Sequence, residues 1–177
     1  GSVYMNDSAA EALAGLDPSI GLSEALKGIF SRPTSPIWMD SSTAAECGEI
    51  RDTLGGLQAT AEATGSTTFE RFSGPQVRKF HKAEPQAYGQ TAHVALVSSF
   101  MASLLAGRVA PIDHGDGAGM NLMDISRRTW HQAALDATAP DLARRLPPLA
   151  ESWTVIGPVS RYFVERYGLN AQAEALV

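Results

Sequence analysis

Three side chains in the first half of the chain have the chemistry to bind a polar ligand: Arg71, Trp38 and Asp40. Arg71 stands between Glu70 and Phe72, and its guanidinium offers a rigid fork of N–H donors to hydroxyl and carbonyl oxygens, although an arginine in such a loop is usually a solvated cation. Trp38 fits either a core position or the apolar wall of a pocket. Asp40 would lie on the same side as Trp38 if a strand continued through both residues, and otherwise would cap the following helix.

The glycine-rich run 113–119, D-H-G-D-G-A-G, is a second candidate because it places Asp113 and Asp116 in a turn-forming segment. It lacks the Lys-Ser/Thr ending of a P-loop, and its acidic residues do not follow the ladder of an EF-hand calcium loop. We therefore predict a structural turn, with Asp113 and Asp116 as neighbours of a binding site.

Metal and hydrolase chemistry find no support in the sequence. The histidines at 81, 93, 114 and 131 share no metal-ligand spacing with one another or with Cys47. No G-x-S-x-G motif surrounds Ser98 or Ser99, which argues against a serine hydrolase. We predict no metal site in the chain and histidines at the surface.

The elements that must position the candidate residues mix helices and strands. A Ser8-x-x-Glu11 capping box predicts a helix over 9–16, and a short helix is expected over 22–30. The apolar run 35–38 predicts a buried strand, followed by a helix that residues 40–43 cap and that runs to Leu54 before Gly55-Gly56. Gly74-Pro75 predicts a helix that starts there and ends near Glu84-Pro85, with Val77 and Phe80 on its buried face.

The second half continues the same mixture. The run 94–105 predicts a strand or helix entry that passes into a buried helix ending at Gly107. Short strands are expected over 109–112 and 121–125, on either side of the glycine-rich turn, and again over 155–159. Helices are expected over 130–136 and 162–167. Strands and helices without strict alternation indicate an α/β fold with helical insertions.

Composition narrows the class of protein. The 177 residues are 44% hydrophobic and 19% charged, which is typical of a globular domain. Fourteen basic and nineteen acidic residues give a net charge of −5 without a basic block, so a nucleic-acid partner is not expected. The single Cys47 excludes an intramolecular disulfide and favours a reducing, cytoplasmic setting. The apolar run 94–106 is short and interrupted by serines, so neither a membrane segment nor a signal peptide is expected.

Six segments, in order along nearly the whole chain, resemble diagnostic stretches of the carbohydrate kinases that phosphorylate D-xylulose, within the superfamily of glycerol kinase and ribulokinase. They are P-I-W-M-D-S-S-T-A-A-E-C (36–47), T-G-S-T-T-F-E-R-F-S-G-P-Q-V-R-K (64–79), L-V-S-S-F-M-A-S-L-L-A-G (96–107), P-I-D-H-G-D-G-A-G-M-N-L-M-D-I (111–125), A-T-A-P-D-L (137–142) and R-Y-F-V-E-R-Y-G (161–168).

This resemblance implies a fold, an activity and site residues. It implies part of an actin-like, ribonuclease-H-like N-terminal sugar-kinase domain, with residues 1–177 as a single partial domain. The implied reaction is transfer of a phosphoryl group from Mg²⁺-bound ATP to D-xylulose. The implied sugar-binding residues are Arg71 in its E-R-F-S-G pattern, Trp38 as a pocket wall, Asp40, and Asp116 near the substrate side of the cleft. The family's nucleotide-binding turn and catalytic aspartate have no match here, so the isolated chain is expected to be inactive.

Two alternatives remain open at this point. The parent could phosphorylate another ketopentose or a polyol, or the chain could be a non-catalytic binding module of kinase ancestry. The coding region after Val177 discriminates a kinase for any of these sugars from a non-catalytic module, because a kinase would continue into a Gly-Asp-Asn segment. A piece cut from such a domain is expected to leave strand edges open and to be marginally stable or dimeric, and a homodimer is also common in the family.

Overall fold

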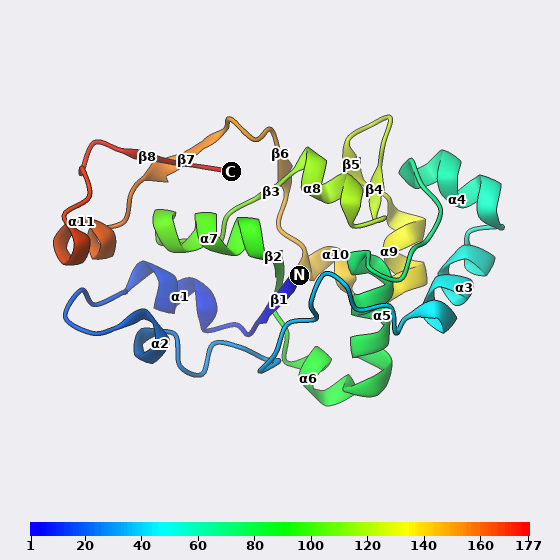
Figure 1. Ribbon diagram of the computed structural model, residues 1–177, viewed down its shortest axis with the longest axis horizontal. Coiled ribbons are helices and arrows are strands. Elements are labelled where there is room, and N and C mark those ends of the chain that lie inside the picture. Colours follow the sequence, from blue (N-terminus) through cyan, green and yellow to red (C-terminus); the bar gives the residue numbers. More distant parts are fainter.

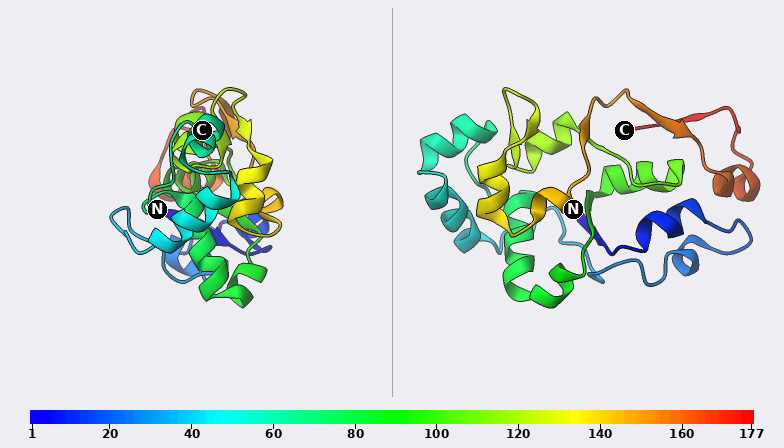
Figure 2. Two further views of the ribbon diagram at one scale, coloured as in Figure 1. Left: turned by 90° about the vertical axis from the view of Figure 1, so that its right-hand side faces the viewer. Right: turned by 180° about the vertical axis from the view of Figure 1, so that it is seen from behind.

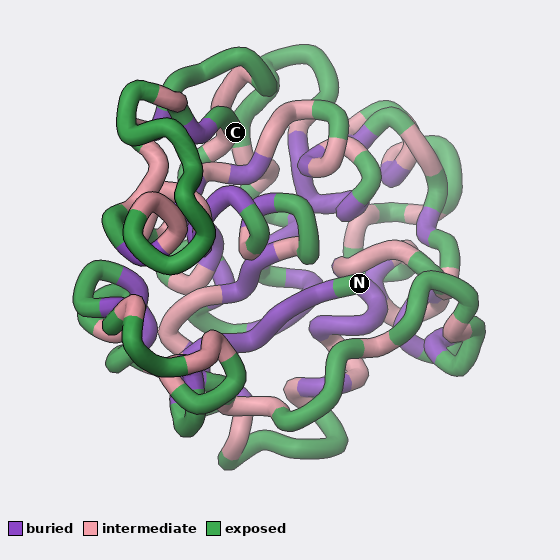
Figure 3. The backbone as a smooth tube through the Cα atoms, turned by 60° about the vertical axis from the view of Figure 1, so that its left-hand side comes forward, coloured by how far each residue is buried: buried purple, intermediate pink, exposed green.

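A buried two-stranded ribbon divides the molecule. In the computed structural model, which describes residues 1–177, β1 (Ser2–Met5) pairs antiparallel with β2 (His93–Leu96), with Ser2 opposite Leu96 and Met5 opposite His93. Successive side chains of a strand point to opposite faces, and both faces here are apolar. Figure 3 shows the first strand as a buried stretch leading away from the N-terminus.

Each face of the ribbon packs against its own hydrophobic core. Tyr4 and Val94 belong to a cluster of 13 buried residues, whereas Val3, Met5 and Ala95 belong to a second cluster of 10. Helices α1, α2, α7 and α11 gather on one side of the ribbon, and α3, α5, α9 and α10 lie on the other (Figures 1 and 2). Because strand residues alternate between two cores, residues 3–5 of β1 form a continuous apolar run and not an alternating pattern.

The remaining elements are short and are joined by many loops. The helices are α1 (Ala9–Ala14), α2 (Leu22–Ala25), α3 (Ala44–Thr53), α4 (Leu57–Thr64), α5 (Ser73–Ala83), α6 (Pro85–Gly89), α7 (Val97–Ala106), α8 (His114–Gly119), α9 (Gln132–Thr138), α10 (Leu142–Arg145) and α11 (Arg161–Tyr167). The further strands are β3 (Ile112–Asp113), β4 (Met123–Asp124), β5 (Thr129–Trp130), β6 (Leu149–Ala150), β7 (Val155–Pro158) and β8 (Glu174–Leu176).

Several helices begin and end where the sequence predicts. Helix α5 begins beside Gly74-Pro75 and buries Val77 and Phe80, and α7 follows β2 directly. Helices α7 and α11 end at Gly107 and Gly168, which adopt the left-handed conformation that glycine accepts most readily. The longest helix, α5, has 11 residues, and none of the helices combines the length and apolarity that crossing a bilayer requires.

The predicted capping box of the first helix is wrong. Ser8 has helical backbone angles and makes no side-chain cap. Its hydroxyl instead donates to the Asn6 Oδ1 at 2.7 Å, and the Ser8 amide donates to the same oxygen. Asn6 therefore organises the turn into α1, a role that the Ser-x-x-Glu pattern does not reveal.

The strands form four separate two-stranded sheets. Strand β3 pairs parallel with β6, β4 pairs antiparallel with β5, and β7 pairs antiparallel with β8. The predicted strand over 35–38 does not form, and these residues are a loop and turn. Prolines 33 and 36 lack the N–H group that a sheet ladder needs, which accounts for the difference. The strands predicted around the glycine-rich run exist as β3 and β4, but they do not pair with each other.

Candidate functional site

Arg71 and Trp38 meet although they come from different loops. The carbon at the centre of the Arg71 guanidinium lies 5.2 Å from the centroid of the Trp38 ring and 5.7 Å from that of Phe69. Trp38 lies in the loop before α3 and Arg71 in the loop before α5. This arrangement presents an aromatic face and a cation together, within the range of a cation–π contact.

Trp38 is not a core residue. Its side chain is 66% exposed, and the neighbouring Ile37 and Met39 are also exposed. The buried strand predicted here would have hidden this ring, whereas the loop displays it. Of the two roles that the sequence leaves open for Trp38, the structure contradicts the core position.

Arg71 has no competing partner in the protein. Its side chain is exposed and forms neither an ion pair nor a hydrogen bond within residues 1–177. Because no carboxylate occupies the guanidinium, its N–H donors face solvent and stay available to a ligand. The aromatic contacts favour this position of the charge weakly and leave its donors unsatisfied.

Asp40 shapes its own loop instead of capping the helix as predicted. Its carboxylate accepts hydrogen bonds from the Ser42 hydroxyl and from the amide of Ser42 at 2.8 Å, and these bonds, in that order, lower the pKa of Asp40. Lys79 of α5 donates to the same hydroxyl and also lowers that pKa. Thr43 is the N-cap residue of α3, without a side-chain cap. Since no strand passes through 38–40, the argument that Asp40 and Trp38 share a strand face does not hold.

The glycine-rich run forms helix α8, so the predicted turn is wrong. Asp113 caps this helix by accepting from the amide of Gly115 at 2.7 Å and from that of Asp116 at 3.2 Å. Gly117 is buried, and a Cβ there would lie 2.5 Å from the Leu149 Cδ2. The capped first turn stabilises the start of the helix, and the close approach of Leu149 in β6 accounts for glycine at position 117.

Asp116 does not belong to the Arg71–Trp38 pair but contacts a different part of the molecule. Its carboxylate accepts a hydrogen bond from Ser98 in the first turn of α7 and has no hydrogen bond with the other three candidates. The two regions approach each other near Gly1, whose carbonyl accepts from Val97 at 3.1 Å. The Pro36 carbonyl would lie 2.9 Å from a Cβ on Gly1. No motif in the sequence marks Ser98 as the hydrogen-bond donor to Asp116.

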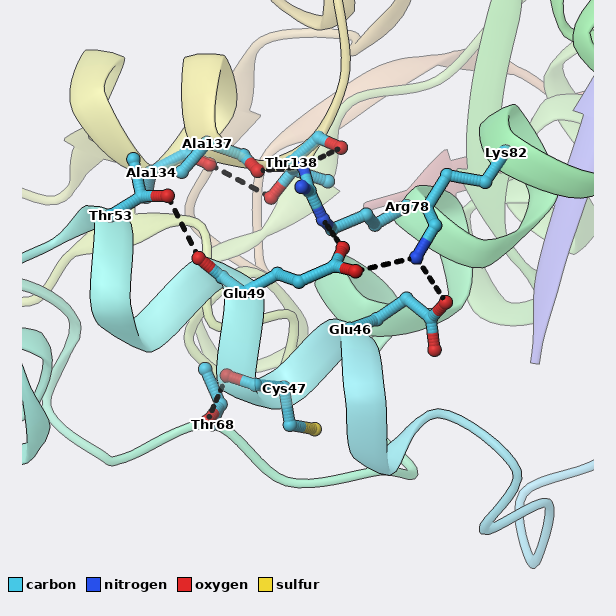
Figure 4. Close-up of polar contacts among 10 residues, drawn as sticks. All are labelled: Glu46, Cys47, Glu49, Thr53, Thr68, Arg78, Lys82, Ala134, Ala137 and Thr138. Carbon is cyan, nitrogen blue, oxygen red and sulfur yellow. Dashed lines mark hydrogen bonds and ion pairs between the residues drawn. The ribbon is translucent and has the colours of Figure 1, made fainter.

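A network of charged side chains holds α5 against its neighbours (Figure 4). Arg78 Nε lies 2.6 Å from Glu49 Oε2, and Lys82 Nζ lies 2.7 Å from Glu49 Oε1 and 2.9 Å from Glu46 Oε1. Arg78 also donates to the carbonyl of Ala137 at 2.5 Å. Lys82 and Arg78, in that order, lower the pKa of Glu49. The helix that begins two residues after Arg71 is thus tied to both α3 and α9.

The histidines are half-buried, not surface-exposed as expected. Burial is the main cause that lowers the pKa of His81, with Arg78 and Arg145 adding to it, and burial also lowers the pKa of His93. Residues 1–177 contain no group of three or more His, Cys, Asp or Glu side chains that could hold a metal ion. The Cys47 thiol is free and buried, and burial raises its pKa.

Comparison with known proteins assigns the chain to a family. Residues 34–174 match the model of the FGGY family of carbohydrate kinases, N-terminal domain. The chain belongs to this family. It is 49% identical over 170 residues to xylulose kinase 2 of Arabidopsis thaliana, covering 96% of this chain and 30% of that protein. It is 46% identical over 168 residues to the xylulose kinase of Rattus norvegicus, covering 95% of this chain and 31% of that protein.

Solved structures agree with this FGGY assignment at the level of the fold. A xyloylose kinase from Brucella ovis matches with a TM-score of 0.78 at 19% identity, over 99% of this chain and 31% of that one. A xylulose kinase from Rhodospirillum rubrum matches with a TM-score of 0.75 at 20% identity, over the same shares. The mixed helix and strand fold is therefore that of FGGY N-terminal domains, and the chain spans about 30% of the length of its curated relatives.

Proposed function

We propose that the enzyme carrying this chain transfers the γ-phosphoryl group of ATP to D-xylulose, giving D-xylulose 5-phosphate, and that this chain supplies part of the sugar-binding side. The xylulose kinases named above support the substrate, since they are 46–49% identical over almost the whole chain. The observation that carries the proposal is the exposed Arg71–Trp38 pair, in which a cation without a protein partner lies over an aromatic ring.

The pair suits a sugar on chemical grounds. A sugar has C–H faces that pack on an aromatic ring, and hydroxyl and carbonyl oxygens that accept hydrogen bonds. Trp38 would bind the apolar face, and Arg71 would donate to oxygens at its edge. Holding the sugar in one orientation is the main task that phosphoryl transfer sets a protein on the acceptor side. Asp40 and Asp116 are proposed as neighbours of this site, Asp40 through the turn that carries Trp38.

The residues present do not fit ATP or Mg²⁺. Two of the first amides of α8 already donate to Asp113, and the carboxylate of Asp116 would repel a phosphate. No cluster of carboxylates offers a magnesium site. We therefore propose that ATP and Mg²⁺ bind to parts of the enzyme other than residues 1–177, and that these residues alone do not consume ATP. We also propose a cytoplasmic location, in keeping with the free thiol of Cys47.

The test is a coupled assay of ADP release by the full-length enzyme with D-xylulose, D-ribulose, glycerol and D-gluconate as acceptors. The expected result is the highest kcat/KM with D-xylulose, with a product whose phosphate is on the terminal carbon by ³¹P NMR. A higher kcat/KM with another acceptor would reassign the substrate. No ADP release with any acceptor would favour the non-catalytic module. Residues 1–177, purified free of host kinases, should release none, and sugar-dependent ADP release by them would contradict the proposed division of the site.

A further inference from the structure

The loops that carry Trp38 and Arg71 are not joined to each other by main-chain hydrogen bonds. No hydrogen bond between main-chain groups joins residues 32–43 to residues 65–72. The aromatic contact between the two side chains is exposed to solvent, where a cation–π pair favours the paired geometry by only about two- to fivefold. Something else must hold the loops in register if the pair is to bind a ligand in one orientation.

Two buried side chains bridge these loops. Gln76, on the first turns of α5 and 5% exposed, donates its side-chain amide to the carbonyl of Asp40 at 3.2 Å and to the carbonyl of Glu70 at 3.1 Å. Thr43, fully buried, donates its hydroxyl to the same Glu70 carbonyl at 2.7 Å. Asp40 is two residues from Trp38, and Glu70 is adjacent to Arg71, so both bridges act next to the candidate site.

The chemistry of Gln76 suits this bridge. A side-chain amide nitrogen carries two N–H donors, so a single group reaches one carbonyl in each loop, which a hydroxyl with one donor cannot do. The donor also stands on a fixed element, because Arg78 and Lys82 of the same helix are bound to Glu49. A buried amide of this kind fixes geometry better than two exposed side chains do.

We propose that Gln76 is a positioning residue for sugar binding, which holds the loops of Trp38 and Arg71 in register and does not itself contact the sugar. The inference rests on the proposed function for its kinetic consequences, although the structural role can be measured without any substrate. Thr43 assists from the Glu70 side.

The first test is kinetic and uses the full-length enzyme. Gln76→Met keeps the length of the side chain but removes both donors, and should raise the KM for D-xylulose about five- to twentyfold while changing the KM for ATP less than twofold. In an Arg71→Ala background the same substitution should have less than a twofold effect, because Gln76 acts by holding Arg71 and Trp38 in register and that pair no longer exists. Multiplicative effects of the two substitutions, or equal changes in both KM values, would overturn the proposal.

The controls separate positioning from stability. Tyr88→Phe removes a partly buried hydrogen bond from the hydroxyl of the buried Tyr88 to the Pro140 carbonyl, 2.8 Å long, away from the two loops. It should lower the melting temperature as Gln76→Met does but leave the sugar KM unchanged. Gln86→Met, on the exposed surface of α6, should change neither. If Gln76→Met does not fold, Thr43→Val provides the same test with a smaller expected rise in KM, about threefold.

The second test needs no sugar. In the enzyme labelled with 5-fluorotryptophan, the ¹⁹F signal of Trp38 is assigned by its loss in Trp38→Phe. It should shift or broaden in Gln76→Met and stay in place in Tyr88→Phe. An unchanged signal in Gln76→Met would refute the positioning role whatever the kinetics. A changed signal in an enzyme that does not phosphorylate D-xylulose would instead leave the positioning role standing and reject the proposed substrate.

Discussion

Arg78→Met should destabilise the domain more than the loss of a surface ion pair would. Arg78 makes two strong contacts: its Nε lies 2.6 Å from the Glu49 carboxylate, and its terminal nitrogen lies 2.5 Å from the carbonyl of Ala137 near the end of α9. The side chain is 26% exposed and Glu49 38% exposed, so the ion pair is partly screened. The Ala137 carbonyl belongs to a buried residue, and losing its charged donor dominates the cost. Together these losses amount to about 1.5–3 kcal/mol of unfolding free energy.

The melting temperature is the measurement. For a domain of 177 residues the loss corresponds to a decrease of about 4–8 °C in Tm. Methionine retains much of the aliphatic packing of arginine, so the decrease reports on the polar contacts. The matched control is Arg161→Met, because Arg161 pairs with Glu165 one turn away on α11 and is 78% exposed. That substitution should leave Tm unchanged within error. Equal shifts for the two variants, or a shift below 2 °C for Arg78→Met, would refute the assignment of Arg78 as the bridge between α3, α5 and α9.

Three further predictions concern the site, pH and backbone conformation. In the full-length enzyme, Arg71→Ala should reduce kcat/KM for the sugar about ten- to a hundredfold and leave the KM for ATP nearly unchanged, and unchanged sugar kinetics would return Arg71 to the role of a solvated cation. The pKa values of His81 and His93 lie below the usual 6.5, so the unfolded state binds more protons as the pH falls through that value. Tm should therefore decrease between about pH 7 and 5.5, and the double variant His81→Gln/His93→Gln should show a flatter profile if the histidines are the cause. Gly107 and Gly168 both have left-handed φ, at +68° and +70°, but only at Gly107 would a Cβ meet a neighbour, at 3.1 Å. Gly107→Ala should thus lower Tm more than Gly168→Ala, whose cost of about 1 kcal/mol is conformational alone; equal losses would mean that the contact has no weight.

The parts of the fold that sequence reasoning predicts correctly depend on local signals. Proline in the first turn of α5, and the left-handed glycines after α7 and α11, act within a few residues of where they stand. The burial of Val77 and Phe80 follows from helical spacing in the same way. Such features require no knowledge of what the element packs against.

Apart from the local contact between Ser8 and Asn6 before α1, the errors occur where long-range contacts decide. The apolar run 35–38 resembles a strand, but it finds no partner strand and remains a loop that displays Trp38. The glycine-rich run forms a helix that Asp113 caps, and its Gly117 packs beneath Leu149, more than thirty positions away. The nearness of Arg71 to Trp38 is also long-range, and only the family resemblance suggested that the two belong to one site. No local pattern marks Gln76, whose partners become apparent only when both loops are in place.

The ribbon of β1 and β2 has a consequence for how the molecule comes apart. Since neighbouring residues of β1 belong to different cores, with Tyr4 in one and Met5 in the other, neither core can lose its packing without exposing one face of the same two strands. The two halves of the molecule are thus cooperative units that share the β1–β2 ribbon. Amide protons in the ribbon should exchange with solvent only when both units open, whereas those of α11 or α4 can exchange through the opening of one unit alone. A substitution that weakens the packing of either core would therefore also destabilise the other core, through the four residues of β1.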